Sequence, residues 1–441
     1  MSVVFWIFRQ IYTLVCWLIL PAVFLRLWLK GQKLPGYRRR WGERVAHYSA
    51  IYKVKNKIKK PILWVHAVSV GELLSAVPFI KQLEMHYPNH QILITTTTPT
   101  GSERVSQIFQ SKLRKTILHV YLPYDLPSFI NRFLNYFQPK CCFIMETEIW
   151  PNLFWAGIQR KMPICIVNAR LSPRSFKGYL KLKRWVQPLL TQITVLTQSE
   201  ADLVRYRTLG VLPEHSQNMG NIKFDLEFPH NIDLKRVAFR KQFQHQPIWI
   251  AASTHAQEEE IVLTAFKQLK KQHPNLLLIL VPRHPDRFDE VAKLCLQAGW
   301  YVARRSHKDW ILPKIDIYLG DTMGELLLLY SVSDVAFVGG SLVPVGGHNL
   351  LEPALFGVPV LTGGVLHNFV HISDLLIQAN HTQIIHNADE LAESVSILLK
   401  DKALRVQKGQ AGKAVVTENR GALNRILGFI KEKKLVQLSL V

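Results

Sequence analysis

Two kinds of segment alternate along most of this chain. Short, nearly continuous apolar runs suit buried strands, and the runs between them carry apolar residues every three or four positions, as amphipathic helices do. This alternation is typical of βαβ units around a parallel sheet. The predicted strands cover residues 61–67, 90–98, 141–146, 162–169, 193–199, 247–253, 275–282, 315–321, 334–341 and 358–364.

The alternation stops between residues 223 and 246, where the chain is polar and rich in basic residues. A chain of 441 residues is also too long for a single core. We therefore expect an α/β protein with two Rossmann-like domains, residues 31–225 and 226–441, facing an interdomain cleft. Open parallel sheets bind ligands at the carboxyl ends of their strands, so the sites should lie there. We also allow for a last helix that crosses back to the first domain.

The N-terminus is apolar in a different way. Residues 3–29 are long and apolar enough to enter a bilayer, although Arg9, Pro21 and Arg26 interrupt them. No small-residue cleavage site follows, so a removable signal peptide is not expected. We predict a membrane anchor over residues 1–30, and leave open whether it spans the bilayer or lies in its interface. The alternative is a buried amphipathic helix of a soluble protein.

A basic flank follows this segment. By the positive-inside rule, the flank places the rest of the chain in the cytoplasm, and it should also attract anionic lipid. Its basic residues are Lys30, Lys33, Arg38, Arg39, Arg40 and Arg44.

Charge and cysteine content narrow the picture only partly. The net charge of +23 implies an anionic partner, and nucleic acid, anionic lipid and a phosphorylated substrate all satisfy it. The five cysteines form no CxxC pair and lie mostly in apolar runs. They are expected to be buried thiols in a reducing compartment, and neither a disulfide framework nor a zinc site.

The first candidate for chemistry lies in WVHAVSVGE, residues 64–72. A buried strand ends there, and Gly71 allows a ligand to approach the backbone closely. Glu72 follows at a helix N-terminus, where a carboxylate can act as a general base toward an acceptor hydroxyl. The alternative is that Glu72 only complements the helix dipole.

A second pair of carboxylates follows another strand. METEIWPN, residues 145–152, places Glu146 and Glu148 two positions apart, so both can reach one cavity from extended chain. Glu148 has a simpler interpretation as a first-turn helix cap. Glu146 ends an apolar run and would be costly to bury unpaired.

GNIKFD, residues 220–225, ends the first domain. Lys223 and Asp225 share a face, so an ion pair between them is one explanation. The other is that Lys223 faces a phosphate or a carboxylate.

Candidate phosphate ligands follow in the second domain. ILVPRHPDR, residues 279–287, places Arg283, His284 and Arg287 after a strand, in position for an anion. GDTMGEL, residues 320–326, sets Gly324 before Glu325 at an expected helix start.

The glycine-rich stretch 338–357 is the most informative part of the second domain. We expect Gly339–Gly340 and Gly346–Gly347 to turn backbone N–H groups toward a ligand. A helix beginning near His348 should add its positive end. Asn349 and Glu352 would share one face of that helix, and a glutamate so placed commonly binds ribose hydroxyls.

Several motifs are absent from the sequence. It has no HExxH, no DxD and no clustered Cys/His spacing, so neither a metal ion nor a cofactor is predicted. A nucleoside monophosphate leaving group needs less charge neutralisation than a diphosphate, which favours such a donor. P-loop, dinucleotide-binding and GxSxG patterns are missing as well.

Together these segments resemble the 3-deoxy-D-manno-oct-2-ulosonic acid (Kdo) transferases of lipopolysaccharide biosynthesis. The resemblance runs from LRLWLKGQKLPGYRRRWGER, residues 25–44, to the glycine-rich region at 338–364. Ten segments occur in family order: VSVGE, TTTTPTGSERV, YLPYDLP, METEIWPN, NARLS, GNIKFD, STH, VPRHP, GDTMGEL and GGSLVPVGGHNLLEP.

The resemblance implies a GT-B fold and an inverting glycosyltransferase that uses CMP-Kdo as donor. It implies a tetraacyl lipid A precursor, lipid IVA, as acceptor. It also implies a place at the cell inner membrane, with an anionic membrane surface as partner and no nucleic acid.

Site residues follow from the same resemblance. Glu72 matches the family's proton acceptor, and Glu146 and Lys223 match positions that stabilise the transition state. One departure is STHAQEEE, residues 253–260, where a glycine is expected near Ala256 and Gln257. The positions that match CMP-binding segments are Pro282, Arg283, Met323, Gly324, Glu325, Asn349, Leu350, Leu351 and Glu352.

Two other functions stay open at this point. One is a GT-B transferase that uses a UDP-sugar. The other is a basic, membrane-tethered binding protein for nucleic acid or anionic lipid, without catalysis.

Overall fold

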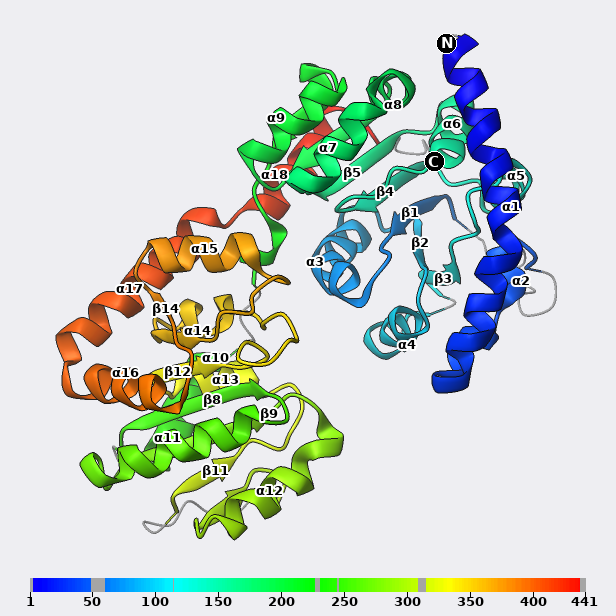
Figure 1. Cartoon of the computed structure of the whole chain (residues 1–441). Coiled ribbons are helices and arrows are strands. Elements are labelled where there is room, and N and C mark those ends of the chain that lie inside the picture. Colours follow the sequence, from blue (N-terminus) through cyan, green and yellow to red (C-terminus); the bar gives the residue numbers. More distant parts are fainter. Residues whose placement is uncertain are drawn as a thin grey trace. The chain divides into compact units, whose positions relative to one another are not determined.

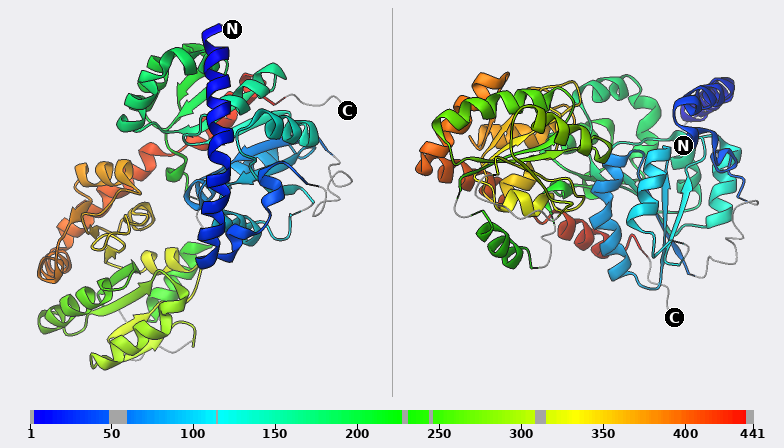
Figure 2. Two further views of the ribbon diagram at one scale, coloured as in Figure 1. Left: turned by 45° about the vertical axis from the view of Figure 1, so that its right-hand side comes forward. Right: turned by 90° about the horizontal axis from the view of Figure 1, so that it is seen from below.

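The computed structural model describes residues 3–48, 60–113, 115–226, 231–243, 246–307 and 315–436 (Figure 1). The chain divides into two compact units. Unit 1 is Met1–Asp225 with Arg420–Val441, and unit 2 is Leu226–Asn419. Each unit is built around a seven-stranded parallel sheet with helices packed on it, which Figure 2 shows from two further sides. The predicted α/β class with two Rossmann-like folds is confirmed.

Unit 1 contains sheet A, in the strand order β3-β2-β1-β4-β5-β6-β7. Its elements are α1 (Val3–Lys33), η1 (Pro35–Arg38), α2 (Trp41–Arg44), β1 (Ile62–His66), α3 (Val70–His86), β2 (Gln91–Thr96), α4 (Pro99–Ile108), β3 (Ile117–Tyr121), α5 (Pro127–Phe137), β4 (Cys141–Met145), α6 (Pro151–Gln159), β5 (Ile164–Ala169), α7 (Pro173–Lys181), α8 (Lys183–Leu190), β6 (Thr194–Thr197), α9 (Glu200–Leu209), η3 (Pro213–His215), β7 (Ser216–Asn218), η4 (Ile222–Phe224) and α18 (Ala422–Glu432).

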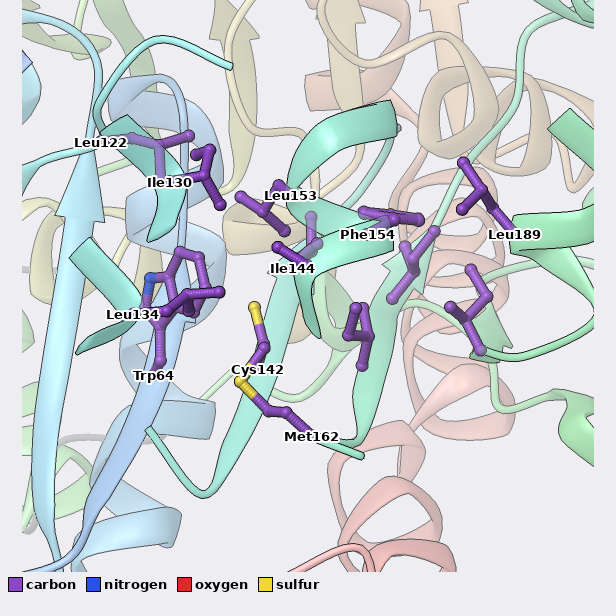
Figure 3. Packing of buried hydrophobic residues seen from close by; sticks show 14 of the residues in the cluster. Trp64, Leu122, Ile130, Leu134, Cys142, Ile144, Leu153, Phe154, Met162 and Leu189 are labelled. Atoms are coloured by element: carbon purple, nitrogen blue, oxygen red, sulfur yellow. The ribbon is translucent and has the colours of Figure 1, made fainter. Parts of the chain in front are cut away.

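The strands of sheet A are apolar on both faces because helices cover both. Alternate residues of a strand point to opposite faces. On one face, Trp64 and Ile144 pack with Leu134 of α5, Phe154 of α6 and Leu189 of α8 (Figure 3). On the other face, residues of β1 and β4 pack against α3 and against α18, which comes from the end of the chain.

Unit 2 contains sheet B, in the order β10-β11-β9-β8-β12-β13-β14. Its core joins β8, β9 and β12 to α11 and α16. Its elements are α10 (Ile232–Lys241), β8 (Ile248–Thr254), α11 (Glu258–Gln272), β9 (Leu277–Pro282), η5 (Pro285–Arg287), α12 (Phe288–Gln297), β10 (Val302–Arg304), β11 (Ile317–Leu319), α13 (Leu326–Ser331), β12 (Val335–Val338), α14 (Leu351–Leu355), β13 (Val360–Thr362), α15 (Val370–Gln378), β14 (Thr382–Ile384), α16 (Ala388–Lys400) and α17 (Lys402–Asn419).

All ten predicted strands are present, and the structure adds β3, β7, β10 and β14. These four are the edge strands of the two sheets. Three of them are only three residues long, too short to show a hydrophobic pattern. The polar interval 223–246, where the alternation stops, contains the helix α10.

The N-terminal helix α1 is long and apolar enough to cross a membrane. In the structure it also packs along unit 1 (Figures 1 and 2). Phe8 stacks on Trp185 of α8, with ring centroids 5.3 Å apart. Asn152 at the start of α6 donates a hydrogen bond to Thr13 Oγ1 at 3.0 Å. One side of α1 is therefore a protein contact, and the other side exposes apolar side chains.

The five cysteines are free thiols, as predicted. Four of them are buried: Cys141, Cys142, Cys165 and Cys295.

Candidate active site

The carboxyl edge of sheet A brings the predicted catalytic residues together. Strand order reverses between β1 and β4, and open α/β sheets bind ligands outside such a switch point. Glu72 follows β1 and Glu146 follows β4 directly. The two carboxylates therefore come from the two strands that flank the switch point.

Glu72 is fixed by the start of α3. Ser69 is the N-cap residue, and its Oγ accepts the N–H of Glu72 at 3.2 Å. In return, Glu72 Oε2 accepts the N–H of Val68 at 2.8 Å, and its Oε1 accepts the Ser69 hydroxyl at 3.1 Å. Glu72 therefore has a structural role at the helix N-terminus, where its charge also complements the helix dipole, as the alternative proposed. A carboxylate has about four acceptor positions, so capping leaves room for another proton donor.

The environment of Glu72 suits a base. Burial raises the pKa of its carboxyl, and the negative charge of Glu146 adds to the rise. The hydrogen bond from Val68 and the charge of Lys223 act in the opposite direction. A carboxyl whose pKa is closer to neutrality is a stronger proton acceptor than an ordinary glutamate.

Glu146 has an unusual backbone conformation. Its φ is +58°, in the left-handed region that costs a residue with a side chain about 1–2 kcal/mol. Its N–H donates to Val167 O of β5 at 3.0 Å, and its own carbonyl accepts the N–H of Arg170 at 3.3 Å. Lys223 Nζ lies 3.5 Å from Glu146 Oε1. Strained residues held from several sides are concentrated at functional sites.

Glu148 joins the same group. Burial raises its pKa to about 7, with a further contribution from the charge of Glu72. It lies three residues before α6, so the first-turn capping interpretation is wrong.

Asp225 has a structural task at the end of the first segment of unit 1. Its carboxylate accepts the N–H groups of Gly421 at 2.5 Å and Leu423 at 2.6 Å, which caps α18. Lys223 pairs with Glu146 and Asp225 caps α18, so the proposed ion pair between Lys223 and Asp225 is wrong.

In unit 2, the predicted nucleotide-binding segments share the carboxyl edge of sheet B. They follow β9, β11 and β12. The strand order of sheet B reverses between β8 and β12, so the glycine-rich stretch lies at a switch point.

The glycine-rich stretch corrects the sequence prediction. Gly339 N–H donates to Ala252 O at 2.9 Å, Gly340 N–H donates to Glu258 Oε2 at 2.7 Å, and those of Gly346 and Gly347 donate to Gly340 O. These four N–H groups are used inside the protein, so the expectation that they turn toward a ligand is wrong. The following helix, α14, begins at Leu351 instead of near His348, and has only five residues.

Glu258 is the residue that shapes this stretch, and the sequence did not reveal it. Its carboxylate is fully buried and accepts the N–H groups of Gly340, Ser341 and Leu342, and that of His255 at 3.0 Å. A side chain at Gly339 would collide with it. In the sequence, Glu258 is one of three consecutive glutamates and looks like any acidic residue in a first helical turn.

Three histidine rings, those of His255, His284 and His348, lie together near Arg283. His255 Nε2 lies 2.8 Å from His348 Nε2, with the two rings stacked, and the His284 ring lies 5.2 Å from that of His255. Burial and the charge of Arg283 together lower the pKa of His348 to about 4. Arg283 is exposed and, among the described residues, makes no ion pair. It is the cation of this group that can meet an anion.

Arg287 differs from the prediction. Its Nη1 lies 2.7 Å from Oε1 of Glu259, whose side chain is fully buried, and its Nη2 lies 3.3 Å from Glu290. Its charge is therefore engaged within the protein.

The other predicted nucleotide contacts are positioned as follows. Arg305 makes two hydrogen bonds to the Glu325 carboxylate, at 2.6 and 2.9 Å. These bonds lower the pKa of Glu325. Asn349 Nδ2 donates to Glu352 Oε1 at 3.1 Å. Leu350 and Leu351 are fully buried, so only their backbone could contact a ligand. Pro282 ends β9, and Met323 and Gly324 are exposed after β11.

Solved structures share this fold. The chain matches a UDP-GlcNAc 2-epimerase from Neisseria meningitidis bound to UDP-GlcNAc with a TM-score of 0.55 at 14% identity, covering 84% of this chain and 100% of that one. A glycosyltransferase from Rickettsia africae matches with a TM-score of 0.50 at 15% identity, covering 86% and 100%. At these identities the likeness shows the fold alone, and it confirms the two-domain GT-B type.

Sequence relatives then identify the family. The profile of the 3-deoxy-D-manno-octulosonic-acid transferases (kdotransferases) matches residues 39–226. The chain is 43% identical to the 3-deoxy-D-manno-octulosonic acid transferase of Haemophilus influenzae, covering 96% of this chain and 98% of that protein. It is 30% identical to that of Rickettsia bellii, with the same two coverages of 96% and 98%. This chain belongs to the Kdo transferase family, and is a glycosyltransferase.

Proposed function

We propose that this enzyme transfers Kdo from CMP-Kdo to a hydroxyl of a tetraacyl lipid A precursor, lipid IVA, with inversion and with Glu72 as general base. One observation carries the proposal. In a chain of the Kdo transferase family, a half-buried Glu72 with a raised pKa shares one sheet edge with the Glu146–Lys223 ion pair. The donor and acceptor rest on the family resemblance of the motifs.

In the proposed reaction, Glu72 accepts the proton of a glucosamine hydroxyl while that oxygen forms a bond to the anomeric carbon of Kdo. The bond from this carbon to the phosphate oxygen of CMP breaks on the opposite face. CMP leaves with the electron pair, so the configuration inverts. Positive charge develops on the sugar ring, where Glu146 stabilises it, and Lys223 neutralises the Kdo carboxylate.

Unit 2 contributes the nucleotide contacts in this proposal. Arg283 binds the CMP phosphate, because its guanidinium makes no ion pair within the described residues while Arg287 is engaged with Glu259. Glu352 and Asn349, which hydrogen-bond each other, are the candidates for the ribose hydroxyls. The proposal includes no metal ion, because the sequence carries no metal-binding motif.

The first experiment replaces Glu72 by Gln. The amide retains an oxygen for the Val68 N–H, so folding should be unchanged, but it cannot accept the substrate proton. We expect turnover to fall about 10²–10⁴-fold, the usual contribution of a general base. Mass spectrometry of the lipid product and CMP release from CMP-Kdo measure the reaction, and a UDP-sugar serves as the competing donor.

Ser69→Ala is the matched control. It removes the two hydrogen bonds that the Ser69 hydroxyl makes with the N–H and the carboxylate of Glu72, which costs about 1 kcal/mol of stability, and the Val68 N–H still holds the carboxylate. This variant should lose thermal stability and keep most of its turnover. Near-normal Kdo transfer by Glu72→Gln would show that Glu72 is not the base.

The pH dependence gives a second test of the base. Glu72 must be deprotonated to act, so kcat falls as the pH drops through its pKa. Because burial and Glu146 raise that pKa, the acid limb should lie above the ordinary glutamate value of 4.5. Glu146→Gln should move the limb to lower pH in the activity that remains. An acid limb at or below pH 4.5 in the wild type, or a limb at higher pH in Glu146→Gln, would contradict the assignment of Glu72 as the base.

The anchor completes the proposal. Helix α1 and its basic flank would hold unit 1 on the cytoplasmic face of the inner membrane, where the lipid acceptor and anionic headgroups are present.

A further inference from the structure

The region after the carboxylate cluster contains no acidic residue. Between Glu148 and Glu200 there is no aspartate or glutamate. Eight lysines and arginines occur in the same interval, and five of them are close together: Arg174, Lys177, Lys181, Lys183 and Arg184.

Helix α7 collects three of these charges on one face. Arg174, Lys177 and Lys181 are spaced by three and four residues, which places them side by side on a helix. All three are exposed, and within the described part of the chain none makes an ion pair or a side-chain hydrogen bond. No residue of α7 is buried. This basic face, defined by Arg174, Lys177 and Lys181, therefore does not serve the core.

The basic face is also open to solvent, and Pro173 and Gly178 lie beside the three basic residues on the same surface. A Cβ placed on Gly178 would meet nothing within 4 Å. Like charges at this spacing repel one another, and surfaces usually mix both signs. Because no acidic side chain among the described residues offsets the repulsion among these three cations, the basic face is suited to bind an anionic ligand.

Helix α7 lies next to the candidate catalytic group. It begins three residues after Arg170, whose N–H donates to Glu146 O at 3.3 Å and whose carbonyl accepts the Thr147 hydroxyl. Tyr179 of α7 is close enough to Glu148 for that carboxylate to help raise its pKa, after burial. The basic face is on the other side of α7 from Tyr179, so an anion bound there would lie about one helix diameter, roughly 10 Å, from the candidate catalytic group.

Helix α8, which directly follows α7, contacts the anchor. It carries Lys183 and Arg184, and its Trp185 stacks on Phe8 of α1. A ligand that reaches α7 along α1 would come from the membrane side. A phosphorylated lipid has both the charge and the location that this surface fits.

We infer that the basic face of α7 binds a phosphate group of the phosphorylated lipid acceptor. The inference rests on the proposed function, and it assigns acceptor recognition to residues outside the catalytic group. The same chemistry could also fit the headgroups of bulk anionic lipid, so the experiment must separate the two sources.

The test uses the double variant Lys177→Gln/Lys181→Gln in the full-length enzyme. The matched control is Lys140→Gln/Lys161→Gln, which removes the same charge at exposed positions before β4 and β5, at the opposite edge of sheet A. The acceptor is offered in neutral detergent, either bisphosphorylated or with both phosphates removed. Binding to each form and KM for each substrate are measured.

We expect the Kd and KM of the bisphosphorylated acceptor to rise about tenfold or more in the α7 variant, since charge-assisted contacts to phosphate are lost. Its Kd for the dephosphorylated acceptor, and its KM for CMP-Kdo, should match the wild type. The control variant should match the wild type throughout.

Two outcomes would overturn the inference. Wild-type enzyme could bind both acceptor forms equally well. Alternatively, the α7 variant could lose binding to phosphatidylglycerol vesicles while its Kd for the bisphosphorylated acceptor in neutral detergent stays unchanged, which would make the face a general membrane contact. Failure of the wild type to turn over any lipid acceptor would instead contradict the proposed function.

Discussion

Asn168 occupies a position next to the catalytic group that the proposed mechanism does not use directly. It lies in β5, is fully buried, and has a left-handed φ of +54°. Its Oδ1 accepts the N–H of Ile222 at 3.1 Å, and its buried Nδ2 has no partner among the described residues. Because Lys223 follows Ile222, this bond fixes the backbone from which Lys223 reaches Glu146.

We therefore predict that Asn168 positions Lys223. Asn168→Gly keeps the left-handed backbone but loses the acceptor, and should lower kcat about 10–100-fold, since small misplacements near the chemistry are costly. Asn168→Asp keeps the acceptor oxygen and tolerates the same backbone, so it should retain more turnover. Steady-state kinetics with circular dichroism as the folding check measure this. Equal activity of the two variants would contradict the role.

At this scale the sequence predicts some residues and cannot predict others. Glu72 and Glu146 follow apolar strands, and the parallel sheet brings such strand ends together, so their proximity was predictable. Glu258 was not, because three of the N–H groups that it accepts lie more than 80 residues later in the chain. Nothing in the local pattern distinguishes it from its neighbours Glu259 and Glu260.

Among the elements, α1 shows how composition can mislead about geometry. Its apolar length alone predicts a membrane segment, and whether it spans was left open. The structure shows a docked side, with Phe8, Thr13 and Phe24 in contact with unit 1. A helix docked along its length on a folded domain cannot be surrounded by lipid. We therefore expect α1 to lie in the membrane interface with only its outer side in lipid.

Spin labels on the outer side of α1 test this orientation. Ile7, Leu14, Leu18 and Leu25 are all exposed, and Leu18 is 71% exposed. Labels introduced by Cys substitution at these sites, in a Cys16→Ser background, should report similar shallow depths in vesicles by collisional relaxation. A label at Leu234, an exposed residue of α10 in unit 2, is the control in water. A steady change of depth from Ile7 to Leu25 would instead mean that α1 spans the bilayer.

The edge strands mark the limit of prediction for regular elements. The ten strands found from sequence are the interior strands of both sheets, which are covered on both faces and read as apolar runs. The missed strands β3, β7, β10 and β14 are at the edges. Three of them, β7, β10 and β14, are short and partly exposed, so they show no apolar run. β3 is a buried five-residue strand, and its length and burial do not explain why it was missed.

For the molecule as a whole, unit 1 is built from two segments of the chain that are far apart in sequence. The chain leaves unit 1 after Asp225 and returns at Arg420. The returning helix α18 buries Ile426 and Ile430 against sheet A, and Asp225 caps its first turn. The core of unit 1 therefore includes α18, which all of unit 2 separates in sequence from the first segment of unit 1.

This arrangement gives the last prediction. Ile426→Ala and Ile430→Ala should each destabilise unit 1 by about 2–5 kcal/mol, because each leaves a cavity in a buried core. Asn424→Ala, an exposed position of the same helix, should cost less than about 0.5 kcal/mol. Hydrogen exchange followed by mass spectrometry resolves the two units. The core variants should lose protection in β1 and β4 of sheet A, while β8 and β9 of sheet B stay protected. Equal loss in both sheets, or none in sheet A, would show that α18 is not what completes unit 1.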